Sequence, residues 1–285
     1  MIRVGLAGWG DHGDIYTDAV NAQGRLRAYG RYFDLVEVDS SFYAVQAEKS
    51  YERWVEETPD GFQFVVKAYQ GMTGHLRGRN PFPDTETMFE AFFQSIRPVR
   101  EAGKLRAVLF QYPPWFDCTR ENVAVLRDAK TRVGDCPVAL EFRHQSWFSP
   151  EFRERTMAFM REAGWMHSVC DEPQVLPGSV PTVLEAANPE ATIVRFHGRN
   201  AGGWTNKPDV DWRAVRYLYQ YSTEELTEWV GWLRQLEAQC REVCVIFNNN
   251  SGGHAAKNAL ELMDMLGLPH PDLPAPSPVQ LDLFE

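Results

Sequence analysis

The sequence lacks the features that assign many chains to a class at once. No run of about 18 apolar residues occurs, so no membrane span is expected. The five cysteines are odd in number and form no C-x-x-C pair, which argues against a disulfide framework and a structural zinc site. The first residues, MIRVGLAGWG, lack the basic-then-apolar layout of a signal peptide. We therefore expect a protein of the reducing cytoplasm.

Motifs for common cofactors are also missing. Neither G-x-x-x-x-G-K-[ST] nor G-x-G-x-x-G occurs, which excludes the P-loop and Rossmann classes of nucleotide-binding protein. No H-E-x-x-H or H-x-H pair supports a zinc centre. The formal net charge is −10, and an acidic surface repels nucleic acid and anionic lipid at long range. A role on DNA would therefore need a local basic pocket or a recruiting partner.

The sequence does contain a regular alternation of two kinds of segment. Eight short β-rich runs, most of them continuously apolar, alternate with amphipathic helical stretches. Helices are expected over 85–103 and 222–239, whereas the Pro-rich segment 171–190 shows no helical pattern. Repeated βα units predict an α/β fold, a TIM-type (β/α)8 barrel, as a single domain over residues 1–267. Residues 268–285 are Pro-rich without apolar periodicity and predict an extended tail.

Most of the β-rich runs end in charged or amide side chains. In a barrel these carboxyl ends converge on one mouth, where barrel enzymes carry their active sites. A salt-bridge network that only plugs the barrel is the alternative interpretation. The predicted catalytic residues are Glu37, Lys67, Glu141, Asp171 and His197. The predicted substrate-binding residues are Gln111, Arg143, His144, Trp147, Arg195 and Asn248.

Several strings in a fixed order carry a resemblance to a known family. They include VEVDSSFY, FQFVVK, LFQYPP, EFRHQSW, VRFHGR and FNNN. Together they resemble the bacterial domain-of-unknown-function 72 (YecE-like) family over residues 1–267. The resemblance implies a TIM-barrel fold and makes the strand-end residues the matched polar positions, without supplying a settled reaction. Asp39 stands where the family typically has Asn, and Gly74 precedes His75 where the family usually has Thr and His adjacent.

The predicted mouth mixes carboxylates with cations. Converging arginines suit a phosphate or carboxylate ligand, so Arg143 and Arg195 are expected to hold an anion. Carboxylates suit acid–base work, with Glu141 or Asp171 as general base and His197 as acid or base. The same three residues could form a Mg²⁺ or Mn²⁺ site, although spacing alone does not support one and the nearby cations argue against it.

Aromatic residues are frequent in the loops that should border the mouth. The long loops over 71–83 and 198–211 both follow strands, so both should overhang it. Trp147 and Trp204 are the best candidates to stack on a sugar or a flipped base. Packing in a cluster beneath the long loops is the alternative for any single aromatic residue.

The last residues carry a second indication of function. Residues 280–284 read QLDLF, which resembles the peptide by which bacterial proteins bind the replication sliding clamp. The amide can bond at a groove edge, the apolar side chains can fill a pocket, and the Pro-rich segment 269–278 would hold the peptide away from the barrel. A chance match, or docking of this end on the barrel itself, is the alternative. The predicted clamp-binding residues are Gln280, Leu281, Asp282, Leu283 and Phe284.

Three functional hypotheses follow from these features. The first is a hydrolase that acts on a phosphorylated or nucleic-acid substrate, cleaves a phosphodiester or N-glycosidic bond, and is recruited by the sliding clamp. The second is a carbohydrate-active barrel hydrolase or isomerase with Glu37 and Glu141 as paired carboxylates, which glycosidases place ~5–9.5 Å apart across an open cleft. The third is a non-catalytic module that binds an anionic ligand and carries it to the clamp.

Overall fold

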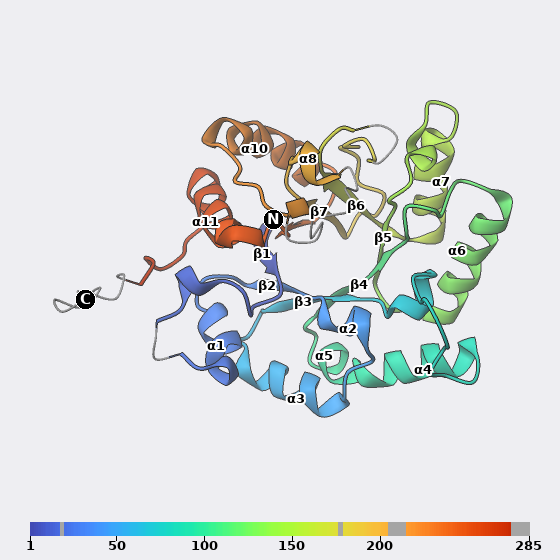
Figure 1. Ribbon diagram of the computed structural model, residues 1–285, viewed down its shortest axis with the longest axis horizontal. Helices are drawn as coiled ribbons and strands as arrows, with labels where there is room; N and C mark the ends of the chain where they lie inside the picture. Colours follow the sequence, from blue (N-terminus) through green and yellow to red (C-terminus); the bar gives the residue numbers. More distant parts are fainter. Residues whose placement is uncertain (18–19, 176–178, 205–214, 275–285) are drawn as a thin grey trace.

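The computed structural model describes residues 1–17, 20–175, 179–204 and 215–274, and it shows a closed barrel of eight parallel strands (Figure 1). The strands follow one another in chain order, and β1 pairs with β8 to close the barrel. The predicted TIM-type barrel is confirmed. The strands are β1 Ile2–Ala7, β2 Leu35–Val38, β3 Gln63–Lys67, β4 Leu105–Gln111, β5 Val138–Glu141, β6 Met166–Asp171, β7 Ala191–Phe196 and β8 Glu242–Phe247.

The helices form an outer layer around the strands (Figure 1). They are α1 Arg25–Tyr29, α2 Ser40–Tyr43, α3 Glu48–Glu57, α4 Thr85–Ser95, α5 Arg97–Glu101, α6 Arg120–Val133, α7 Arg153–Ala163, α8 Ala201–Trp204, α10 Thr223–Glu237 and α11 His254–Leu266. Short 3-10 turns are η1 Gly13–Ile15, η2 Ala22–Gly24, η3 Gln70–Thr73, η4 Gln145–Phe148 and η5 Ser251–Gly253. Within the described part of the chain, none of the helices has the length and apolar character needed to cross a membrane.

Local sequence sets the bounds of the two predicted helices. The helix expected over 85–103 is divided into α4 and α5 at Ile96, and Pro98 lies in the first turn of α5, where its missing N–H leaves no helical bond unmade. Before α10, Ser222 and Glu225 form a capping box, each side chain accepting from the other's backbone N–H. Between β6 and β7, residues 172–175 and 179–190 contain no helix, as predicted.

The side chains that point to the barrel axis form an apolar layer along its middle. Strands β1 and β2 come close together there because residue 5 is glycine: a Cβ atom at Gly5 would lie 2.0 Å from the carbonyl oxygen of Leu35. Towards the carboxyl ends of the strands the interior becomes polar. The apolar layer consists of Ala7, Leu35, Val65, Ala107, Leu109, Ala139, Met166, Ala191, Ile193, Cys244 and Ile246.

The chain leaves the barrel at the end opposite to the mouth. α11 runs back from the carboxyl end of β8 (Figure 1). Leu268 and Pro269, which follow it, line a pocket together with Ile2 at the amino end of β1. The Tyr32 hydroxyl donates to the carbonyl oxygen of Asp272 over 3.2 Å and holds the start of the tail there. The predicted clamp-binding residues 280–284 lie outside the described residues.

Candidate active site

Strand alternation brings most of the predicted polar residues together inside the barrel mouth. Successive strand side chains point to opposite faces, so residues two apart on a strand and its extension share the interior. Side-chain contacts, and in the case of Lys67 the effect of its charge on Glu37, join residues from six strands into one group, which we name the mouth network. Its members are Glu37, Lys67, Gln111, Glu141, Arg143, Arg195, His197 and Asn248.

Arg195, on β7, is the centre of the mouth network. Its side chain is 1% exposed, and it makes two parallel bonds to Glu37, from Nε to Oε2 at 2.8 Å and from Nη2 to Oε1 at 2.7 Å. Its Nη1 donates to the two oxygens of Glu141 at 3.0 and 2.8 Å, and it also donates to Gln111 over 3.4 Å. Because these bonds all go to side chains of the protein, Arg195 holds two carboxylates in place.

Glu141, on β5, accepts bonds from several further donors. Ser168 Oγ donates to its Oε2 over 3.0 Å, and Nη1 of Arg143 lies 3.3 Å from its Oε1. Burial opposes ionisation of this carboxyl group, but the positive charge of Arg195, followed by the neighbouring His197 and Arg143, holds its pKa well below the ordinary 4.5. Glu141 is therefore ionised at neutral pH.

The pKa of Glu37, on β2, is shifted in the opposite direction to that of Glu141. Burial raises the pKa of its carboxyl group above the ordinary 4.5, although Arg195 and Lys67 act against this shift. One guanidinium shared by two carboxylates supplies a single positive charge, and Glu141 has the additional donors. The two carboxyl groups therefore differ in how readily they hold a proton, and such a difference separates acid and base roles in enzymes.

Lys67, at the end of β3, is a cation of the network with donors that no described residue accepts from. Its Nζ donates to Oδ1 of Asp39 over 2.8 Å and lies 4.6 Å from the ring centroid of Phe42. Burial opposes its charge, but Asp39 raises the pKa of the ammonium group, so Lys67 is a cation at neutral pH. Since an ammonium group has three donors and Asp39 takes one, Lys67 can still bind an anionic group.

His197 lies beside Glu141 in the buried part of the network. Burial, followed by the positive charges of Arg143 and Arg195, lowers its pKa well below 6.5, so the ring is neutral at neutral pH. Its Nδ1 lies 3.0 Å from Nδ2 of Asn248, and its Nε2 lies 3.6 Å from Oε1 of Glu141 without a hydrogen bond to any described residue. A neutral imidazole next to an ionised carboxylate can take up and release a proton during a reaction.

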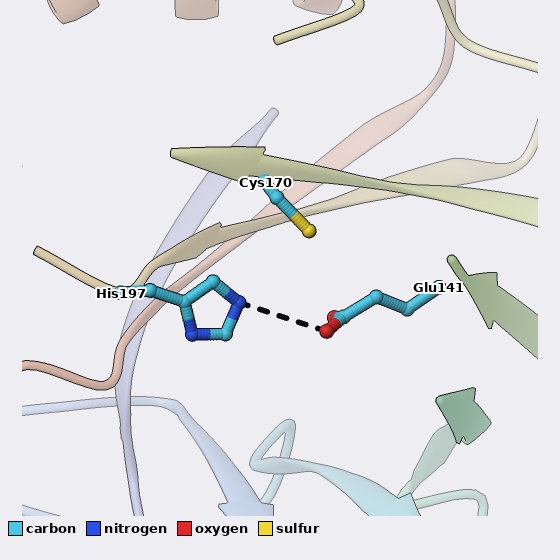
Figure 2. A group of neighbouring side chains, drawn as sticks. All are labelled: Glu141, Cys170 and His197. Carbon is cyan, nitrogen blue, oxygen red and sulfur yellow. Dashed lines mark ion pairs between the residues drawn. The ribbon is translucent and has the colours of Figure 1, made fainter. Parts of the chain in front are cut away.

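The predicted catalytic residue Asp171 lies on the other face of β6. Its two oxygens accept from Nε of Arg199 at 3.0 and 3.1 Å, away from the mouth network. The interior position belongs to Glu172, whose Oε2 lies 2.9 Å from Nη1 of Arg143. The alternation that turns Cys170 inward (Figure 2) also turns Glu172 inward, so a strict count along β6 could have found it. The expected position of Asp171 in the ring is corrected to Glu172.

The two tryptophans singled out in the sequence have different environments. Trp147 is 1% exposed, stacks on Phe142 with ring centroids 4.0 Å apart, and donates from its indole N–H to the carbonyl oxygen of Phe116 over 2.7 Å. Trp147 is therefore a packing residue in the interior, which is the alternative to stacking on a sugar or base. Trp204 lies next to the network, with its ring centroid 5.4 Å from Cζ of Arg143.

His144 also lies beside the network and not in it. Its Nδ1 lies 2.7 Å from Oγ of Ser146 and accepts from the backbone N–H of the same residue over 3.3 Å, at the start of η4. The Ser146 hydroxyl accepts in turn from the backbone N–H of Cys118 over 2.8 Å. His144 thus helps to tie the loop after β5 to the loop after β4.

Glu141, Cys170 and His197 bring three types of metal ligand together, with ligand atoms all within 4.8 Å of one another (Figure 2). Carboxylate, thiolate and imidazole form a zinc-type set, whereas Mg²⁺ and Mn²⁺ prefer oxygen ligands. Both Glu141 oxygens already accept bonds from Arg195, and burial raises the pKa of the Cys170 thiol, so the group fits proton transfer better than metal binding. The expected Mg²⁺ or Mn²⁺ set is not assembled, because Asp171 lies on the other face of β6.

A closed (β/α)8 barrel with a buried, mixed-charge network at the carboxyl ends of its strands defines a TIM-barrel protein with a polar site at its mouth. The chain belongs to the family described as "Protein of unknown function DUF72", whose family model matches residues 3–281. The predicted family is thereby confirmed.

Individual relatives are similar over most or all of their length. The chain is 55% identical over 286 residues, 100% of both chains, to UPF0759 protein YunF of Bacillus subtilis. It is 24% identical over 247 residues, 80% of this chain and 82% of the relative, to UPF0759 protein YecE of Escherichia coli. The crystal structure of a DUF72 family protein from Enterococcus faecalis has a TM-score of 0.90 at 36% identity, covering 96% of this chain and 98% of that one. The barrel is thus a shared feature of the family.

Proposed function

We propose that the mouth network is the active site of a hydrolase that acts on a phosphorylated or nucleic-acid substrate. The observation that carries the proposal is that two buried carboxylates share Arg195 while their pKa values are shifted in opposite directions. Apolar side chains could plug a barrel at a lower cost in stability than buried charges. Groups with opposed pKa shifts, located where barrel enzymes have their active sites, are candidates for proton-transfer chemistry.

Each member of the network has a defined role in this proposal. Glu37, whose pKa is raised by burial, takes up a proton during the reaction and passes it to the leaving group, and Glu141, through His197, accepts a proton from the attacking water. Lys67 binds the phosphate with its remaining donors. Arg195 is a positioning residue that keeps the two carboxylates in place, and Lys67 joins Arg143, one of the two arginines expected to hold the anion, in binding the phosphate.

The carbohydrate-active alternative has less support. It requires Glu37 and Glu141 to flank an open cleft, because a glycosidase places the sugar between its two carboxyl groups. In the structure the guanidinium of Arg195 lies between them and bonds to both.

Hydrolysis assays with the purified full chain test the proposal. The substrates are phosphorylated nucleotides, single-stranded DNA and RNA, and duplexes with a damaged base, each with and without Mg²⁺ or Mn²⁺. We expect turnover of at least one of them, and we expect Glu141→Gln to lower its rate on the order of 10²-fold or more, the scale of lost acid–base catalysis.

Glu242→Gln is the matched control for these assays. Glu242 is also a buried carboxylate, but it lies at the other end of the barrel, with Oε1 3.1 Å from Nε of Arg106. Its replacement should leave the rate unchanged. Equal rates for the wild type and Glu141→Gln on every substrate would refute the hydrolase. Ligand binding without any turnover would instead favour the non-catalytic anion-binding module.

We also propose that the bacterial sliding clamp recruits the protein through residues 280–284. The support is the QLDLF string, the Pro-rich segment before it, and the departure of the tail from the end of the barrel opposite to the mouth. Binding through this tail would leave the mouth accessible to substrate. Recruitment also removes the need for long-range attraction between an acidic protein and DNA.

A pull-down with purified sliding clamp tests recruitment. The full chain should bind, and the double substitution Leu283→Ala with Phe284→Ala should abolish binding because it removes the side chains that fill the apolar pocket. Pro276→Ala, in the tether before the motif, is the matched control and should still bind. Failure of the full chain to bind, or equal binding of both variants, would refute recruitment and leave the hydrolase proposal unaffected.

A further inference from the structure

Trp115 is a large aromatic side chain that the fold holds in solvent at the rim of the mouth. It is 56% exposed in the loop after β4. Pro113 and Pro114 restrict the backbone before it. The next residue, Phe116, is anchored: its N–H donates to the carbonyl oxygen of Pro113 over 2.9 Å, and its ring stacks on Tyr112 at 4.2 Å. The loop therefore presents Trp115 to solvent from a fixed backbone.

A row of rings and cations connects Trp115 with the mouth network. Cζ of Arg77 lies 5.5 Å from the Trp115 ring centroid, and the His75 ring approaches Trp115 edge-on at 5.8 Å. His75 packs in turn against Phe42 at 5.1 Å, and the Phe42 ring centroid lies 4.6 Å from Nζ of Lys67. The exposed ring is thus continuous with the cation assigned to the phosphate.

The properties of this row suit one class of ligand. Aromatic side chains stack on nucleic-acid bases of any identity, and an adjacent arginine adds a cation–π contribution and a donor for phosphate. Burial, followed by the charges of Lys67 and Arg143, lowers the pKa of His75 to about 4, so its ring is neutral at neutral pH. Cations gathered at this rim of a chain with a net charge of −10 favour an anionic ligand over a neutral one.

We propose that Trp115 and Arg77 form a nucleotide subsite, in which the base stacks on Trp115, the phosphate binds Arg77, and the row of rings leads on to Lys67 in the mouth network. The ligand is a nucleotide, either free or within a single strand. The inference rests on the proposed function, because it names the substrate class of the hydrolase. A sugar can also stack on tryptophan, but a neutral sugar would make no use of the two cations.

Isothermal titration calorimetry with the full chain tests the subsite. The probes are adenosine 5′-monophosphate, adenosine, inorganic phosphate, a short single-stranded oligonucleotide and a neutral trisaccharide. We expect the monophosphate to bind more tightly than adenosine or phosphate alone, since each of these lacks one half of the interaction. Tighter binding of the oligonucleotide identifies a strand as the ligand, and equal binding identifies the free nucleotide.

Variants assign this binding to Trp115. Trp115→Ala should weaken binding of the monophosphate ~5–150-fold, the range for loss of one stacked base, whereas Trp115→Phe should retain most of the affinity. Leu218→Ala is the matched control, because Leu218 is an exposed apolar side chain in the loop after β7, on the opposite side of the barrel. Equal nucleotide affinity of the wild type and Trp115→Ala would overturn the subsite. Binding of the trisaccharide alone that depends on Trp115 would also overturn it.

The proposed nucleotide subsite and the proposed hydrolase activity can be refuted independently of each other. Glu141→Gln should keep the nucleotide affinity while losing hydrolysis. Nucleotide binding that depends on Trp115, without turnover of any substrate, would support the subsite and overturn the hydrolase. Turnover of nucleotides with the same KM in Trp115→Ala as in the wild type would support the hydrolase and overturn the subsite.

Discussion

At the scale of single residues, the buried guanidinium of Arg195 determines the properties of the groups around it. It compensates the charge of two carboxylates that come from different strands, Glu37 and Glu141. Neither carboxylate has access to solvent. Replacement of Arg195 by an uncharged residue would leave both carboxylates without their shared counter-charge in a region of low dielectric constant.

The first prediction concerns Arg195→Met. We expect it to lower the free energy of unfolding in urea by about 3–5 kcal/mol, the cost of breaking a buried ion pair from one side. Adding Glu37→Gln and Glu141→Gln should restore part of the loss. Arg100→Met is the matched control, because Arg100 pairs with Asp135 at the surface and such pairs contribute about 1 kcal/mol or less. A loss for Arg195→Met no larger than that of the control would contradict the central position of Arg195.

Strand alternation predicts which residues face the mouth network, and on β6 it still holds one residue past the end of the strand. Glu37 and Arg195 lie on the interior face as the period of two requires. Asp171 is one residue out of phase, because the alternation on β6 continues through Cys170 to Glu172. Trp147 shows a different limit, since nothing local in a sequence separates a ring that packs in the interior from one that meets solvent.

At the scale of elements, the contact between β1 and β2 depends on a glycine. We predict that Gly5→Ala destabilises the protein by about 3 kcal/mol or more, because its Cβ atom would lie 2.0 Å from a backbone oxygen that cannot move aside. Gly231→Ala is the matched control: apart from its chain neighbours and the backbone of its own helix α10, no atom of the described residues lies within 4 Å of a Cβ at this position, and alanine favours a helix by up to about 1 kcal/mol. Urea unfolding measures both, and equal stability of the two variants would contradict the close approach of β1 and β2.

The two faces of β6 give a second prediction at this scale. Glu172→Gln should slow hydrolysis with a smaller effect on KM, because Glu172 positions Arg143 in the mouth network. Asp171→Asn should leave the rate unchanged and lower the free energy of unfolding by about 1–3 kcal/mol, because it weakens the bonds to Arg199. Kinetics and urea unfolding measure the two effects, and a slower reaction in Asp171→Asn alone would return Asp171 to the active site.

The elements themselves could be predicted well from the sequence. Eight apolar runs give eight strands, and the Pro-rich segment after β6 lacks a helix where the structure describes it. The division between α4 and α5 was missed, although Pro98 was its local signal. Apolar periodicity continues through the break, so periodicity alone does not reveal it.

At the scale of the whole molecule, the mouth network and the C-terminal tail lie at opposite ends of the barrel. The sequence alone does not show how these two features are arranged in space. The mouth network lies at the carboxyl ends of the strands, and the tail leaves from the amino ends. The fold and the family could be predicted from the sequence. The reaction could not, because it depends on how charges from distant strands, such as Glu37 and Arg195, compensate one another once they are buried.

Measurement of the Glu37 and Glu141 pKa values is the most direct test of the acid–base assignment. Carbon-13 NMR of glutamate-labelled protein follows each carboxyl group with pH, and Glu37→Gln and Glu141→Gln assign the two signals. We predict that Glu37 titrates above 4.5 and that Glu141 stays ionised to well below 4.5. The stability contributed by Glu141 would then be lost as pH falls, and that of Glu37 as pH rises. Titration of both groups together below 4.5 would contradict the separation of acid and base roles.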